Sequence, residues 1–290
     1  MLTKEQFHTE IEQGLRFLDG ATGSNLQKAG MPRGCCTEAW VLEHPQALMQ
    51  LQQAFARAGS QILYAPTFQA QPIALAREGL DRETEKINAK LVALSRSAAP
   101  DCLIAGDLTT LAAFCDSWDP DNIDLLIENY RRQIRGLIDG GADLLVAETL
   151  MYPQEAEAIL TAAELENAGA VMCSFVMTPD GSLFSGRDAA PVLRDLAEMG
   201  AVAVGFNCVT ADMMTPFLVR KLAKEIPFPL LCKPNAGMPV IDDSGVPRYD
   251  MATDSFAQIL LDCRRSGAKL LGGCCGTTPE HIAAMTSIMD

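Results

Sequence analysis

The chain has 290 residues, 48% of them hydrophobic, with 22 glycines and no low-complexity segment. Its 37 acidic and 23 basic residues give a formal charge of −14 without a Lys/Arg cluster, which argues against nucleic acid or anionic membranes as partners. The N-terminus lacks the layout of a secretion signal and no apolar run could span a bilayer, so we expect a cytoplasmic protein.

One unit recurs along the chain: a short apolar run, a turn with Gly, Pro, Asp or Asn, and then a longer segment with helical spacing. The predicted strands are 15–18, 61–65, 102–105, 144–147, 170–176, 201–206, 230–233 and 269–272. The predicted helices include 84–98, 122–139, 153–167, 189–199, 213–225 and 279–289. Eight β/α units predict a closed parallel barrel, so the expected architecture is a single (β/α)8 TIM barrel domain over residues 1–290.

Polar and sulfur-bearing residues follow most of the predicted strands. Barrel enzymes build their sites from the C-terminal ends of the strands, so these residues are expected to meet at one rim. They are Asp19-Gly20, Thr67, Asp107, Glu148-Thr149, Asn207-Cys208, Asn235 and Cys274-Cys275.

Three of these residues form a candidate metal site. Cys274 and Cys275 follow the last strand in a glycine-rich segment, and Cys208 ends another apolar run. Three protein ligands leave one position open, as in catalytic zinc, whereas structural zinc usually takes four ligands. Because soft thiolates favour Zn²⁺ among common cellular metals, we predict one Zn²⁺ per chain, with the open position available to a substrate.

The other cysteines have simpler interpretations. In a large chain of this kind we expect free thiols instead of a disulfide framework. The vicinal pair Cys35-Cys36 lies away from a strand end and is interpreted as a loop feature, and His281 as a surface or first-turn helix residue. Isolated cysteines inside apolar runs are interpreted as small buried hydrophobic residues, namely Cys102, Cys173, Cys232 and Cys263.

Two acids and one lysine are further candidates. Asp19 and Glu148 could hold the ammonium group of a substrate, although Asp19 could instead form the turn before Gly20 and Glu148 could be an ordinary loop or cap acid. Lys233, followed by Pro234, leaves open a Schiff-base lysine of the aldolase type, but that chemistry would leave the cysteines unexplained.

Four segments, in order along nearly the whole chain, resemble the motifs of the homocysteine S-methyltransferase family. The last of them, with its Cys pair, is the most specific, and its wording together with Pro-Asn-Ala-Gly is most similar to the homocysteine-binding module of cobalamin-dependent methionine synthase. The segments are Asp19-Gly20-Ala21-Thr22-Gly23-Ser24, Gly205-Phe206-Asn207-Cys208, Lys233-Pro234-Asn235-Ala236-Gly237 and Gly272 to His281.

This resemblance implies a (β/α)8 barrel in which Cys208, Cys274 and Cys275 hold Zn²⁺ and the sulfur of homocysteine takes the fourth position. Coordination deprotonates a thiol, so zinc would supply a nucleophile at neutral pH.

The same resemblance implies roles for five residues around the zinc. Asp19, Gly20 and Glu148 would bind the amino acid end of homocysteine. Asn207 and Asn235 would shape the zinc pocket.

The chain also departs from the family. Thr22 and Ser24 stand where methionine and threonine are frequent. The Asp-x-His-x-x-Gly pattern of cobalamin-binding modules is missing from the sequence. We therefore expect a zinc-dependent homocysteine S-methyltransferase that forms methionine and takes its methyl group from a methylcorrinoid, such as methylcobalamin, carried on a separate protein.

Two alternatives remain open at this stage. S-methylmethionine or betaine could be the methyl donor; because both are cations, an acid- or aromatic-lined pocket would favour them. Alternatively, the chain could be a non-catalytic subunit that binds homocysteine and zinc.

Overall fold

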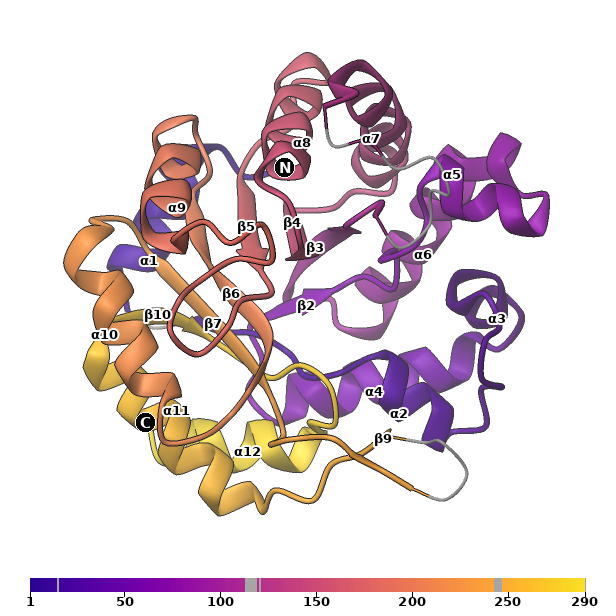
Figure 1. Cartoon of the computed structure of the whole chain (residues 1–290). Helices are drawn as coiled ribbons and strands as arrows, with labels where there is room; N and C mark the ends of the chain where they lie inside the picture. Colours follow the sequence, from indigo (N-terminus) through magenta and orange to yellow (C-terminus); the bar gives the residue numbers. More distant parts are fainter. Residues whose placement is uncertain (15, 113–118, 120, 243–246, 290) are drawn as a thin grey trace.

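The computed structural model describes residues 1–14, 16–112, 119, 121–242 and 247–289, and these residues form a (β/α)8 barrel (Figure 1). Eight parallel strands pair in the order β1-β10-β7-β6-β5-β4-β3-β2, and a parallel bridge between Leu18 and Ile62 joins the two ends of this order. The predicted barrel is confirmed. Leu15, the first residue of the first predicted strand, lies outside the described residues. The barrel strands are β1 (Arg16–Phe17), β2 (Ile62–Tyr64), β3 (Leu103–Thr109), β4 (Leu144–Leu150), β5 (Val171–Phe175), β6 (Ala203–Thr210), β7 (Leu230–Asn235) and β10 (Ala268–Leu271).

Helices surround the strands in Figure 1 and connect each strand to the next. Several helices begin where their sequences favour a start. The side chains of Asn122 and Asp188 accept hydrogen bonds from the first turns of α7 and α9. Proline stands in the first turn of α8, α10 and α12. The α-helices are α1 (Lys4–Glu12), α2 (Gly23–Lys28), α3 (Thr37–Glu43), α4 (Pro45–Arg57), α5 (Pro72–Leu75), α6 (Thr84–Ala98), α7 (Ile123–Asp139), α8 (Pro153–Leu165), α9 (Ala189–Glu198), α10 (Thr215–Glu225), α11 (Thr253–Ser266) and α12 (Pro279–Ser287).

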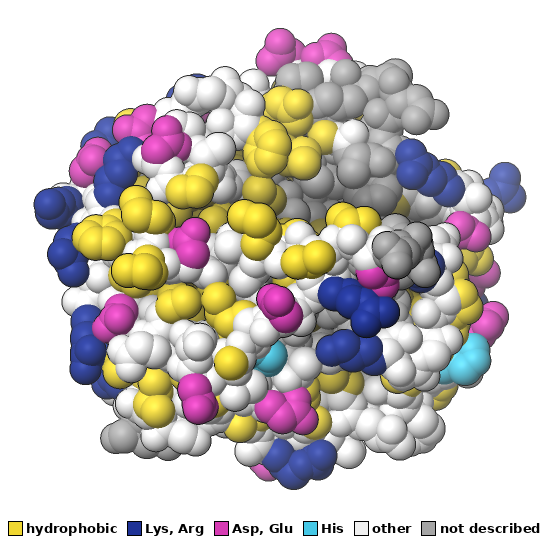
Figure 2. Space-filling model, turned by 60° about the horizontal axis from the view of Figure 1, so that its bottom comes forward, with side chains coloured by type: hydrophobic (Ala, Val, Ile, Leu, Met, Phe, Trp, Pro, Cys, Tyr) yellow, Lys and Arg dark blue, Asp and Glu magenta, His cyan; other side chains and the backbone are white. Residues whose placement is uncertain are grey.

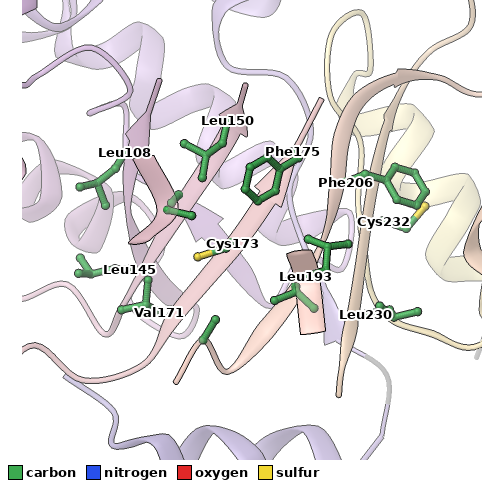
Figure 3. Close-up of a cluster of buried hydrophobic side chains, with 14 of the residues drawn as sticks. Leu108, Leu145, Leu150, Val171, Cys173, Phe175, Leu193, Phe206, Leu230 and Cys232 are labelled. Carbon is green, nitrogen blue, oxygen red and sulfur yellow. The ribbon is translucent and has the colours of Figure 1, made fainter. Parts of the chain in front are cut away.

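The core has two main parts because alternate residues of a strand face opposite sides of the sheet. In β4, Leu145 packs in the large cluster between the strands and the helices, whereas Leu144 and Val146 pack in a smaller cluster inside the barrel. Figure 3 shows part of the large cluster, where Leu145, Val171 and Cys173 extend from neighbouring strands.

The inner cluster is closed at the N-terminal end of the barrel. Phe7 and Ile11 of α1 are buried in it, and the backbone of Leu2 exchanges hydrogen bonds with Asp143 and Ala170 at 2.6 and 2.9 Å. The N-terminal end of the barrel is thus plugged, which leaves the C-terminal end for a binding site.

Four strands extend further toward the C-terminal rim than the sequence predicted. Asp107, Glu148, Asn207, Cys208 and Asn235 lie within strands, so the prediction that they follow the strands is wrong for these residues. The reason is that strands are defined by backbone pairing, which continues through these polar residues: Asp107 pairs with Val146, and Asn207 pairs with Lys233. The residues therefore sit on a rigid part of the barrel.

A short antiparallel hairpin of β8 (Val240–Ile241) and β9 (Pro247–Arg248) follows β7 on the same rim. It leads directly to Tyr249, whose side chain reaches the site described below. In the described part of the chain, none of the helices combines the length and apolarity needed to cross a membrane.

Candidate active site

Three cysteine sulfurs come together at the C-terminal rim. Cys208 projects from β6, and Cys274 and Cys275 follow β10; their Sγ atoms all lie within 4.8 Å of one another, and those of Cys208 and Cys275 are 3.8 Å apart. A tetrahedral zinc with Zn–S bonds of about 2.3 Å separates its sulfur ligands by roughly 3.8 Å. The three thiols therefore fit zinc with one coordination position left over.

Local backbone geometry brings these sulfurs together. Cys208 has a φ of 57°, at a point where the pairing of β6 with β7 shifts register. The backbone N–H of Cys274 donates to Pro234 at 2.7 Å, and the carbonyl of Cys275 accepts from Ala236 at 2.9 Å. Gly276, with a φ of 81°, has no room for a side chain, because a Cβ there would lie 2.2 Å from the Tyr249 ring.

Asn207, the residue before Cys208 in β6, forms hydrogen bonds with the strands β4 and β5. Its Oδ1 accepts hydrogen bonds from the backbone N–H of Thr149 at 2.8 Å and from Ser174 Oγ at 3.0 Å, and its Nδ2 donates to Thr149 Oγ1 at 2.7 Å. Thr149 itself has a φ of 59°. Asn207 thus ties β4, β5 and β6 together directly beside the cysteine site.

The cysteines share their protons. Hydrogen bonds from Cys208 and Cys274 lower the pKa of Cys275 to about 3, and a hydrogen bond from the Tyr249 hydroxyl lowers the pKa of Cys275 as well. Hydrogen bonds with Cys274 and Cys275, together with burial, raise the pKa of Cys208. The cluster therefore loses its first proton readily, and a divalent cation would compensate the remaining negative charge.

A cavity of about 280 Å³ opens beside the sulfurs and reaches into the barrel mouth. Lys233 of β7 is buried in its wall, where its ammonium group lies 3.2 Å from Asp19, 3.6 Å from Glu148 and 3.9 Å from the centre of the Tyr64 ring. Burial lowers the pKa of Lys233, but Asp19 and Glu148 outweigh this effect and hold the pKa well above its ordinary value. A lysine held as a cation is a poor nucleophile, which argues against Schiff-base chemistry.

The predicted substrate-binding residues occupy different places around this cavity. Gly20 and Glu148 line it, and a Cβ on Gly20 would lie 2.7 Å from Phe55. Asp19, Asn207 and Asn235 are buried but do not line it. Asp19 instead accepts a hydrogen bond from the Tyr64 N–H at 2.8 Å, next to its ion pair with Lys233.

The other cysteines and His281 lie outside the three-sulfur cluster. The nine cysteines within the described ranges are all free thiols; Cys173, Cys232 and Cys263 are fully buried, while Cys102 is only partly buried. Cys36 donates to Glu38 at 3.4 Å, outside the three-sulfur cluster. His281 lies in the first turn of α12, as one of its two interpretations expected, but it is buried, and its Nε2 contacts the Met251 carbonyl at 3.0 Å.

Four residues of the site were not assigned a role from the sequence. They are Tyr64, Asp107, the cationic Lys233 and Tyr249. The sequence carried a signal for the first three, because alternate residues of a strand face the same side. Ala105 and Leu231 face the inside of the barrel, and Asp107 and Lys233, two residues later, line the cavity.

The buried Glu148 leads to a prediction about pH. Burial raises the pKa of Glu148 from 4.5 to about 7. Because the pKa is higher in the folded state, its stabilising contribution is present below the unfolded pKa and is lost as the pH rises through about 7. In the wild type, the free energy of unfolding should therefore decrease between about pH 5 and 7.5. We expect this decrease to be smaller in Glu148→Gln, by on the order of 2–3 kcal/mol.

Urea unfolding of the reduced, zinc-free protein at both pH values measures this difference. The matched control is Glu164→Gln, which removes an exposed acid from α8 and should leave the pH profile as in the wild type. Parallel profiles for the wild type and Glu148→Gln would contradict the assigned pKa shift.

Comparisons with known proteins agree with this geometry. The profile of the family described as homocysteine S-methyltransferase matches residues 16–289. The homocysteine S-methyltransferase of Escherichia coli K12 is 28% identical, over 94% of this chain and 95% of that protein.

Solved structures give the same result. The homocysteine methyltransferase MmuM from Escherichia coli, in a metallated crystal form, superposes with a TM-score of 0.83 at 27% identity, covering 99% of this chain and 100% of that one. The carboxyl transferase domain of Rhizobium etli pyruvate carboxylase shares only the fold, with a TM-score of 0.56 at 14% identity over 94% of this chain and 43% of that one. The chain therefore belongs to the homocysteine S-methyltransferase family of enzymes, as its motifs predicted.

Proposed function

We propose that this chain transfers a methyl group to the sulfur of homocysteine, with Cys208, Cys274 and Cys275 as the zinc ligands. The observation that carries the proposal is the convergence of the three sulfurs within 4.8 Å of one another, with those of Cys208 and Cys275 3.8 Å apart, close to the separation in tetrahedral zinc; one position is left for a fourth sulfur. When bound, zinc would keep the substrate sulfur as a thiolate at neutral pH.

The residues of the chain would bind and orient the reactants. The cavity would hold the homocysteine chain beside the cysteines, with Gly20 and Glu148 in its wall. The substrate thiolate attacks the methyl carbon in line: the new S–C bond forms as the bond from carbon to the donor breaks, and that bond's electron pair leaves with the donor. Methionine is the product, and positioning of the two reactants supplies much of the rate enhancement.

For the donor, we propose a methylcorrinoid carried on a separate protein. Two observations support this proposal. The Cys-pair segment Gly272 to His281 is most similar to that of cobalamin-dependent methionine synthase, and the surface at the rim carries exposed hydrophobic residues. Figure 2 shows hydrophobic side chains gathered across one face of the molecule. Exposed hydrophobic residues lie on or beside the loops after β5, β6 and β7, at the end of the barrel where the sulfurs lie, namely Phe184, Met213, Met214, Phe217 and Met238. Such a surface suits a donor that arrives on a protein.

A small cationic donor is the second candidate. The cavity wall carries the acids Glu38, Asp107 and Glu148 and the rings of Tyr64 and Phe68. Acids and aromatic faces together bind sulfonium and ammonium groups. This combination supports S-methylmethionine or betaine as the alternative.

Methionine formation distinguishes these candidates. Zinc-loaded protein, kept anaerobic, is incubated with homocysteine and with methylcobalamin, S-methylmethionine or betaine in separate reactions. We expect slow turnover with free methylcobalamin that rises when a methylcorrinoid protein supplies it. Turnover only with a small cation would replace the corrinoid proposal by the second candidate. No methionine from any of these donors, including the protein-borne one, would favour a binding subunit without activity.

A further inference from the structure

Tyr249, the residue that follows the β8–β9 hairpin, contacts the cysteine pair from outside the cavity. Its ring packs so closely on Gly276 that a Cβ there would lie 2.2 Å from the ring, and its hydroxyl donates a hydrogen bond to Cys275. A phenol has an ordinary pKa of about 10, so at neutral pH it keeps the proton that it donates. Cys275 lines the cavity and Tyr249 does not. The tyrosine therefore reaches a proposed metal ligand without occupying the space for substrate.

The segment that carries Tyr249 is fixed by a histidine of the cysteine-pair segment. Nδ1 of His281 accepts a hydrogen bond from the Thr278 N–H at 3.2 Å, so in the neutral ring the proton lies on Nε2, which donates to the Met251 carbonyl at 3.0 Å. The His281 ring is buried edge-on to Phe256, with 5.5 Å between the ring centres. Because Met251 is two residues after Tyr249, this hydrogen bond limits the movement of the tyrosine relative to the cysteines.

A second sulfur of the cluster also has a donor outside the cavity. Nδ2 of Asn207 lies 3.8 Å from Sγ of Cys274. Cys274 and Cys275 are thus each contacted by a polar side chain from a different part of the chain. Hydrogen bonds to a thiolate are charge-assisted and stronger than those between neutral groups, and donors behind a metal ligand orient it and tune its electron density.

Resting on the proposed function, we propose that Tyr249 is a positioning residue of the metal site, whose hydroxyl holds the Cys275 thiolate in the orientation in which it ligates Zn²⁺. The ring rests on Gly276 and the backbone is held through Met251, so the hydroxyl has little freedom to turn away. The affinity of the chain for zinc then depends on this hydroxyl as well as on the three sulfurs.

Tyr249→Phe tests this role, because it removes the hydroxyl and keeps the ring on Gly276. Zinc affinity is measured by competition with a chelator, without homocysteine or a methyl donor, and Co²⁺ is bound in place of Zn²⁺ to record an absorption spectrum. We expect zinc to bind about tenfold more weakly. We also expect the sulfur-to-cobalt charge-transfer band to move to longer wavelength, because a thiolate without the hydrogen bond gives up its electrons more easily.

The matched control is Tyr130→Phe. The Tyr130 hydroxyl is buried and donates to the Thr109 carbonyl at 2.9 Å, outside the three-sulfur cluster. Its loss should lower the thermal unfolding midpoint and leave the zinc affinity and the cobalt band as in the wild type. This control separates an effect on the metal site from a general loss of stability.

The outcomes also separate the two proposals. An unchanged zinc affinity or an unchanged cobalt band in Tyr249→Phe would overturn the role of Tyr249, and so would an equal loss of affinity in Tyr130→Phe, while zinc binding by the wild type still supported the proposed function. A wild type that does not retain one zinc per chain would overturn both. Tyr249→Leu, which also lacks the hydroxyl, serves as the second variant if the phenylalanine variant does not fold.

Discussion

Cys208→Ser is expected to abolish zinc retention and to lower methyl transfer by at least about a hundredfold. A serine hydroxyl is a much harder and less acidic ligand than a thiol, so two sulfurs remain where the geometry provides three. Removal of a ligand also removes the charge that the metal site needs to balance Zn²⁺. Zinc content after dialysis, measured by elemental analysis, and methionine formation should therefore fall together.

The matched control is Cys102→Ser. Cys102 lies just before β3, outside the three-sulfur cluster, and donates to the Ser60 carbonyl at 3.3 Å, a contact that a hydroxyl can also make. This variant should retain zinc and activity. Full zinc occupancy in Cys208→Ser would show that the ligand assignment is wrong.

Lys233→Met is expected to destabilise the fold by about 3–5 kcal/mol, because it leaves buried carboxylates without their cation. The ammonium group of Lys233 is almost fully buried between Asp19 and Glu148, so no solvent replaces it. Without the lysine, the pKa values of both carboxyl groups in the folded state rise further. Their stabilising contribution is present below the unfolded pKa and is lost as the pH rises, so the deficit should be larger at about pH 8 than at about pH 5.

Urea unfolding of the variant and the wild type at the two pH values measures this loss. Lys269→Met, which removes an exposed lysine from β10, is the matched control and should change stability by less than about 1 kcal/mol. A deficit in Lys233→Met that is equal at both pH values would show that the lysine does not compensate the carboxylates.

Much of the fold followed from the sequence because its signals are local. Apolar runs of strand length alternate with amphipathic segments, and this alternation allows few arrangements other than a parallel barrel. The helix that begins after Asn122 and the one that begins at Pro153 were predicted within a residue of their starts, since capping side chains and proline act within one turn. The strand ends were predicted less well, because they depend on pairing with neighbours distant in sequence.

The convergence of the three cysteines was predicted for a different reason. Cys274 and Cys275 are adjacent in the chain, and the barrel topology alone places the end of β6, with Cys208, on the same rim. The shift of register that turns Cys208 toward the other sulfurs carries no clear signal in the sequence.

The amino-acid sequence by itself determined the barrel, the family and the three cysteines, since strand alternation and motif spacing are properties of the chain. Only the tertiary structure decided how the charges are shared: that Lys233 lies between Asp19 and Glu148, that Tyr249 reaches Cys275, and that Oδ1 of Asp107 is buried without a hydrogen-bond partner among the described residues. Electrostatic free energies depend on distance and burial between residues from different strands. Those distances exist only once the barrel has closed.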